Sequence, residues 1–161
     1  MNPRDAHIAL AAQLREELAG ARRMLEILEE EQRALKQQDL PAMEAAAQAK
    51  LAHHGEWEAM AARRNGLLRM AGFTADRDGL AACISWCDQA GKLDGLWQEL
   101  AALLDTCRRL NRSNGLAVEL CQKQVGDALA ILHGGPPAGT PVYDASGTAA
   151  PRGEGRSLGS A

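Results

Sequence analysis

Aromatic and β-branched residues are scarce in this sequence. Aromatic side chains make up 3% of the chain, with one Phe and one Tyr, and no run of Val, Ile or Thr occurs. Strands are enriched in these residue types, so a sheet is not expected. Apolar residues nevertheless make up 46% of the chain, and much of this share is alanine. Because alanine favours helix and fills little volume, the composition predicts long, slender helices around a narrow core.

The sequence also lacks a large excess of acidic or basic residues, and it lacks long apolar runs. Acidic and basic residues are mixed along the chain and leave a net charge of −3, so no basic patch indicates nucleic-acid binding. No stretch approaches the roughly 18 apolar residues that span a membrane, and no apolar targeting segment follows the N-terminus. We therefore expect a cytoplasmic protein that neither binds nucleic acid nor inserts into a membrane.

The few candidate metal ligands lie at unfavourable spacings. Cys83 and Cys87 are one helical turn apart and could supply two zinc ligands, but no second pair follows at a recognisable spacing. His53 and His54 are adjacent, so on a helix they point in different directions and cannot chelate one metal together. We expect no catalytic residue, no metal and no cofactor. A small Cys/His metal or redox protein remains an alternative, which elemental analysis would test.

The strongest pattern is a single apolar stripe between Leu93 and His133. Apolar and small residues recur there at alternating steps of four and three, and two steps of four meet at Cys121. That spacing is typical of a coiled-coil seam. A helix of this length, about 60 Å at 1.5 Å per residue, needs partner helices to cover its stripe. The seam comprises Leu96, Leu100, Leu103, Cys107, Leu110, Asn114, Ala117, Cys121, Val125, Ala128 and Leu132.

Two other long helices precede this one. Apolar residues at three- and four-residue spacing predict a helix over about residues 3 to 38. Asp39, with Pro41 close behind it, predicts the start of a second helix that runs to about residue 70. The connection is so short that the two helices should fold back antiparallel. The expected apolar side of the second helix comprises Met43, Ala47, Leu51, His54, Trp57, Ala61 and Leu68.

A short helix and a tail complete the expected fold. Thr74 can cap a short helix over about residues 75 to 89, before the long helix begins. The last residues, Gly135–Ala161, contain too few apolar side chains to order themselves. We therefore expect an all-α antiparallel bundle of three long helices with a short helical crossover, over residues 1–134, and a disordered tail over residues 135–161.

Two features allow more than one interpretation. Asn114 lies within Asn111–Gly115, a run of poor helix formers in the middle of the long helix. It either fixes the register and the number of partner helices, as a seam asparagine does, or marks a stretch left weakly packed for an exchanging partner. Tyr143, the only tyrosine, lies in the tail. It is either incidental or part of a linear docking motif that orders on binding.

These same stretches resemble the FlgN family of flagellar export chaperones. The matching elements are the run Leu110–Gly115, the Glu119-Leu120 pair after it, and the tail element Val142–Gly147, in this order. The resemblance spans the helical region and the first part of the tail. It implies a non-catalytic cytoplasmic chaperone of flagellar type III secretion. Such a chaperone binds the C-terminal segments of the hook-filament junction proteins FlgK and FlgL, keeps them soluble and delivers them to the export gate.

The resemblance also implies two sites. Tyr143, with its neighbours Val142 and Asp144, would dock the chain onto the export-gate protein FlhA. Clients would bind the C-terminal helical part. The expected client-binding residues are Leu104, Cys107, Leu110, Asn114, Ala117, Val118, Cys121, Val125, Ala128 and Leu132. A self-associating coiled-coil tether without an exported client remains an alternative, although it leaves Tyr143 without a role.

Overall fold

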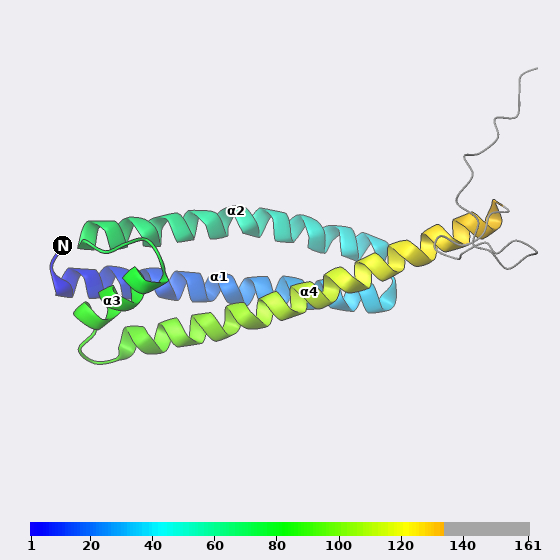
Figure 1. Ribbon diagram of the computed structural model, residues 1–161. Coiled ribbons are helices and arrows are strands. Elements are labelled where there is room, and N and C mark those ends of the chain that lie inside the picture. The colour runs from blue at the N-terminus through cyan, green and yellow to red at the C-terminus, as the bar shows by residue number, and fades with distance from the viewer. Residues whose placement is uncertain (134–161) are drawn as a thin grey trace, which may run out of the picture. The chain divides into compact units, whose positions relative to one another are not determined.

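The computed structural model describes residues 1–133, which contain four helices and no strand. The helices are α1 (Pro3–Gln37), α2 (Leu40–Ala71), α3 (Arg77–Cys87) and α4 (Lys92–Leu132), as Figure 1 shows. The all-α prediction is confirmed, and the three long helices and the short one follow in the predicted order. The chain divides into two compact units, Met1–Ala117 and Val118–Ala161. The expected tail over residues 135–161 lies outside the described residues.

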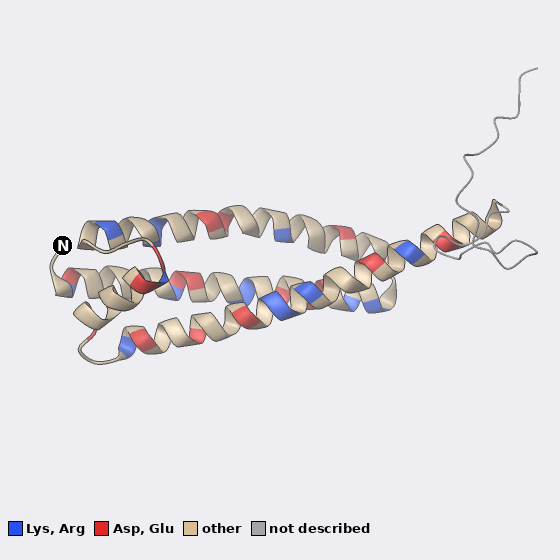
Figure 2. Ribbon diagram, in the orientation of Figure 1, with Lys and Arg blue, Asp and Glu red and all other residues tan. Residues whose placement is uncertain are grey.

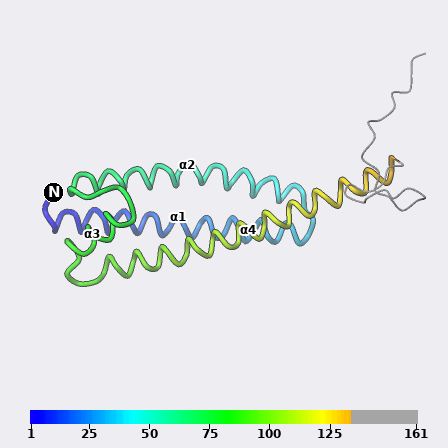
Figure 3. Tube along the Cα trace, in the orientation of Figure 1, coloured from blue at the N-terminus to red at the C-terminus, as the bar shows by residue number. Residues whose placement is uncertain are grey.

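The first unit begins with an antiparallel hairpin of α1 and α2 (Figure 3). The chain reverses at Gln38, whose φ of 55° is left-handed, and the backbone N–H of Asp39 donates to the carbonyl of Ala34 at 3.0 Å. This arrangement satisfies a carbonyl at the end of α1. The Asp39 carboxylate then accepts a 3.1 Å hydrogen bond from the N–H of Ala42 and caps α2. The predicted cap and the predicted hairpin are confirmed.

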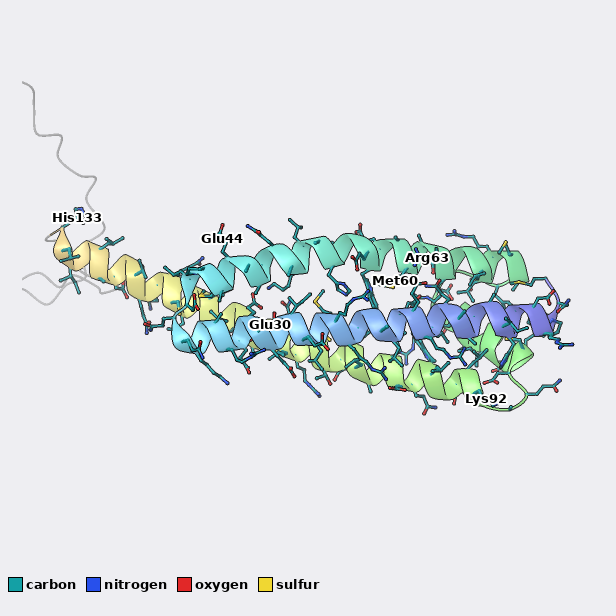
Figure 4. All side chains as sticks on the ribbon, turned by 180° about the vertical axis from the view of Figure 1, so that it is seen from behind. Glu30, Glu44, Met60, Arg63, Lys92 and His133 are labelled. Atoms are coloured by element: carbon teal, nitrogen blue, oxygen red, sulfur yellow. The ribbon has the colours of Figure 1, made fainter. Side chains whose placement is uncertain are left out.

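The predicted apolar side of α2 is correct at its end, where Leu68 is buried and Trp57 is partly buried against the core, but wrong in the middle of the helix. Leu51 is 75% exposed and His54 is exposed, whereas His53 and Met60 are buried. Alanines occur all round α2, so apolar spacing does not determine which side faces α1. Polar contacts with α1 mark the buried side instead, among them a 3.0 Å hydrogen bond from Gln13 to the carbonyl of Met60. Figure 4 shows Met60 between the two helices.

The apolar core lies where α1, the end of α2, α3 and the first part of α4 meet. Trp97 and Phe73 are partly buried against this core, and the rings of Phe73 and Trp86 lie 5.5 Å apart. Trp86 and Trp97 therefore both lie near this end of the hairpin. Its large buried side chains are Leu10, Leu14, Leu18, Leu68, Leu80, Ile84, Leu93 and Leu100.

The residue that caps α3 is Asp76, and the prediction of Thr74 is wrong. Asp76 Oδ1 accepts a 2.7 Å hydrogen bond from the N–H of Gly79, and the Thr74 hydroxyl donates to the same oxygen at 2.9 Å. The Gly79 and Thr74 hydrogen bonds hold the pKa of Asp76 below its ordinary value. A Cβ on Gly79 would lie 2.0 Å from the Thr74 carbonyl oxygen, so only glycine fits this turn.

A single carboxylate also organises the start of α4. Asp88 follows α3, and its two oxygens accept hydrogen bonds from the N–H groups of Lys92, Leu93 and Asp94 at 3.1, 2.6 and 3.1 Å. Burial alone would raise the pKa of Asp88, but these three donors hold it below its ordinary value, with a further contribution from His7. One side chain therefore satisfies three of the backbone donors at the N-terminus of α4.

Candidate interaction surface of the last helix

Within the first unit, α4 packs against α1 with a seven-residue period. Cys107 Sγ lies 3.6 Å from the carbonyl oxygen of Ala21, and Arg22 pairs with Glu99 at 2.7 Å. This period is the one expected for a coiled-coil seam, so the seam prediction holds for this part of α4. The buried residues of α4 are Leu93, Leu100, Cys107 and Asn114.

Asn114 joins three helices in one hydrogen-bonded network. Its Nδ2 donates to the carbonyl of Leu28 at 2.8 Å and to Oε2 of Glu31 at 2.9 Å. Oε1 of Glu31 in turn accepts from Lys50 of α2 at 2.6 Å. Asn114 is 2% exposed, so a shift of α4 along α1 would leave its amide buried without partners. These contacts favour the interpretation that Asn114 fixes the register of α4.

Beyond Ala117, the described part of α4 carries large apolar side chains that remain exposed. Val125 is 60% exposed and Leu132 is 81% exposed. Buried apolar surface is the main source of helix stability in water, so exposed side chains in this number mark a surface suited to a partner. The exposed apolar residues of this segment are Leu120, Val125, Leu129, Ile131 and Leu132, and Leu116 precedes them in the first unit.

The expected client-binding residues fall into three groups by burial. Cys107 and Asn114 are buried in the first unit, where α1 already occupies them. Leu104, Leu110, Ala117, Val118 and Cys121 are half-buried, whereas Val125, Ala128 and Leu132 are exposed. The exposed group is therefore accessible to a partner. Tyr143, Val142 and Asp144 lie outside the described residues.

Sequence reasoning did not identify four exposed apolar residues of α4: Leu116, Leu120, Leu129 and Ile131. The predicted seam covers one side of the helix, and these residues lie beside it or on another side. The signal was present, because Leu116 and Leu120 are one turn apart and Leu129 follows Val125 by one turn. Apolar side chains on more than one side of a helix would have indicated a wider contact surface.

Few charges interrupt this surface. Within Val118–Leu132 the charged residues are Glu119, Lys123 and Asp127, each separated from the next by one helical turn. Such a helix has one polar side and a broad apolar remainder, which suits packing against an amphipathic helix of another protein. Affinity would then come from apolar area rather than from ion pairs.

The cysteines of the core are unsuited to chemistry. Cys83, Cys87 and Cys107 are buried, and burial raises the pKa of all three thiols, that of Cys87 to about 11. They are therefore protonated at neutral pH and pack as small apolar side chains. In residues 1–133, no group of three or more His, Cys, Asp and Glu side chains could hold a metal ion. No helix in that range is long and apolar enough to cross a membrane.

Comparison with known proteins identifies the family. The model of the family described as FlgN protein matches residues 1–151, which is nearly the whole sequence. Neither the curated proteins nor the solved structures contain a match to this chain. The family match extends over the hairpin, α3 and all of α4. The chain therefore belongs to the FlgN family, a family of flagellar export chaperones.

Proposed function

We propose that this chain is a cytoplasmic chaperone for the hook-filament junction proteins FlgK and FlgL. It binds their C-terminal regions, keeps them soluble and delivers them to the flagellar export gate. The family is one of chaperones rather than enzymes, and a non-catalytic role fits the protonated, buried thiols of the core. In this proposal, the last part of α4 provides the binding surface.

One observation carries this proposal, namely the exposed apolar side chains at the end of α4. The side chains of Val125, Leu129 and Leu132 are half or more exposed, and they lie one turn apart along the helix. An amphipathic helix of a client could cover them in the manner of a helix packed into a groove. Covering each such side chain contributes about 1.5 to 3 kcal/mol before the costs of association.

Delivery to the export gate is assigned to a different element, the tail around Tyr143. We propose that Tyr143, with Val142 and Asp144, contacts FlhA while α4 holds the client. The separation in sequence between Leu132 and Tyr143 allows one chain to bind two proteins at once, and linkage raises the effective concentration of the second. Substitution of Tyr143 by Ala should weaken FlhA binding and leave client binding unchanged.

The direct test is titration calorimetry with the C-terminal segment of FlgK from the same genome. The segment is titrated into the full chain and into a version that ends at Gly134. We expect binding in the micromolar range or tighter, retained on truncation, because the proposed surface precedes the tail. Absence of binding by both versions, together with stable self-association in sedimentation experiments, would favour the coiled-coil tether.

A further inference from the structure

A groove lies on the first unit between α2 and α4, apart from the end of α4. It contains two hollows of about 390 and 440 Å³, which share Arg108 of α4 as a lining residue. The first is lined by the end of α2, the start of α3 and the first half of α4. The second is lined by α1, the middle of α2 and α4. The two hollows therefore follow α4 on the side that faces α2.

Apolar and polar side chains both line the groove, about half of each. Leu51 contributes a side chain that is 75% exposed, and Trp97 and Leu104 contribute half-buried side chains at the other end. Leu51 is the residue that the apolar pattern of α2 places inside the protein, yet it faces this opening. An exposed leucine at the edge of a groove that Met24 also lines is better explained by a partner that covers it than by the packing of the hairpin.

The charge of the groove is positive, although the chain as a whole carries −3. Lys50 and Arg64 are paired with the buried Glu31 and Glu17. Arg77 and Arg108 have no ion-pair partner among residues 1–133, which leaves their charge available. The one carboxylate in the lining, Asp76, is engaged by the N–H of Gly79. Figure 2 shows the concentration of basic residues in the middle of α4.

The dimensions suit one helix. The lining residues of α4 run from Trp97 to Asn111, which corresponds to about 21 Å, or about four turns of helix. α2 and α4 are antiparallel along this stretch and both pack on α1, so an added helix would complete a four-helix arrangement. The apolar residues in the groove suit a helix with an apolar stripe, and the basic residues along the groove suit acidic side chains beside that stripe.

We infer that the groove between α2 and α4 binds an amphipathic helix whose apolar stripe is flanked by Asp or Glu. The inference rests on the proposed function, because that function supplies the partner: a segment of the exported client other than the one at the end of α4. The apolar stripe covers Leu51, and the flanking carboxylates pair with Arg77 and Arg108. The chaperone then holds its client at two separate places.

The inference is tested with two designed helical peptides of about 18 residues that share one leucine stripe. One carries Glu beside the stripe and the other carries Lys. Each is titrated at low salt into the full chain, into Arg108→Glu and into Arg109→Glu. Arg109 is the matched control, because it lies next in sequence, pairs on the surface with Asp105 at 3.1 Å and does not line either hollow.

The Glu peptide should bind the wild-type chain more tightly than the Lys peptide does. Arg108→Glu should weaken binding of the Glu peptide about tenfold or more, whereas Arg109→Glu should change it less than about twofold. Leu51→Ser, at an exposed position, should also weaken it. Equal effects of Arg108→Glu and Arg109→Glu, equal affinity for the two peptides, or no binding of the Glu peptide would overturn the inference.

The client itself separates this inference from the proposed function. The purified client protein is titrated into the same three proteins. Weaker binding by Arg108→Glu than by Arg109→Glu supports the groove as a client site. Equal binding by all three overturns the groove as a client site and leaves the proposed function standing. No binding by the wild-type chain contradicts the proposed function, while the peptide titrations still decide whether the groove binds an acidic helix.

Discussion

At the scale of single residues, the most consequential group is the carboxylate of Glu17. It is buried between α1 and α2, where it pairs with Arg64 and accepts a 3.0 Å hydrogen bond from Gln13. Burial raises the pKa of Glu17, whereas Arg64 and Gln13 lower it. The effect of burial is the largest, so the pKa of this carboxyl lies above its ordinary value. The charged pair is therefore a weak source of stability, but its separation would leave a buried charge without a partner.

Substitution of Arg64 by Met should destabilise the bundle by about 3 kcal/mol at neutral pH, because Glu17 then loses its counter-ion. A carboxyl whose folded-state pKa is raised stabilises the fold at low pH, and this stability is lost as pH rises through that pKa. The penalty of Arg64→Met should accordingly be smaller near about pH 5 than near about pH 7. Urea unfolding at both pH values measures it.

Arg63 provides the control for that experiment. It pairs with Glu16 at 2.5 Å, and both side chains are about half exposed. Arg63→Met should change the free energy of unfolding by no more than about 1 kcal/mol, with little dependence on pH, because exposed ion pairs contribute little. Equal penalties for the two substitutions would show that burial of Glu17 has no special role.

At the scale of elements, two short connections hold α3 and α4 in place. Gly79 allows the first turn of α3 to approach the carbonyl of Thr74, and Asp88 caps α4. Both depend on local backbone geometry rather than on buried apolar area. Their contributions can therefore be measured by substitutions that leave the core unchanged.

Gly79→Ala should destabilise the protein by about 2 kcal/mol or more, because a Cβ there meets backbone that cannot move without opening the turn. The same substitution at Gly55, within α2, should stabilise it by about 0.5 to 1 kcal/mol, since Gly55 has open space around it. Thermal unfolding of both variants measures the contrast. A stabilising Gly79→Ala would contradict the described turn.

Asp88→Ala should cost about 1 to 2 kcal/mol at neutral pH, because three backbone donors lose their acceptor. The pKa of Asp88 is lowered in the fold, so its stabilising effect is present above about pH 4 and is lost as pH falls through the folded-state value. The difference between variant and wild type should therefore shrink in acid, as measured by urea unfolding. Asp105→Ala, on an exposed turn of α4, should show neither effect.

At the scale of the whole molecule, the sequence predicts the order and the bounds of the long helices well. Capping residues such as Asp39 and the seven-residue seam through Asn114 carry that information locally. The rotation of α2 could not be predicted, because its alanines mark no side. Buried polar contacts decide it, such as that between Gln13 and Met60. These contacts join residues 47 positions apart and leave no local pattern.

The sequence predicts the candidate surface only in part, because its local pattern does not show which apolar residues are buried. The seam pattern of α4 continues from Asn114 to Leu132 in steps of three and four residues, although the residues differ in burial: Asn114 is buried and Leu132 is exposed. Periodicity indicates which side of a helix is apolar, but not whether a partner helix of the same chain covers it. The spacing of Leu120 and Leu129 indicates that they are apolar neighbours on the helix, but only their accessibility shows that no helix of the described chain covers them.

The measurement that tests the central claim most directly compares two variants, each with a single lysine substitution, at neighbouring positions near the end of α4. Leu129→Lys puts a charge among the exposed apolar residues, whereas Ala130→Lys puts the same charge on the side that carries Lys123 and Asp127. Titration calorimetry with the FlgK C-terminal segment should show that Leu129→Lys weakens binding about tenfold or more and that Ala130→Lys leaves it nearly unchanged. Equal affinities for both variants and the wild type would contradict the assignment of the client to this surface.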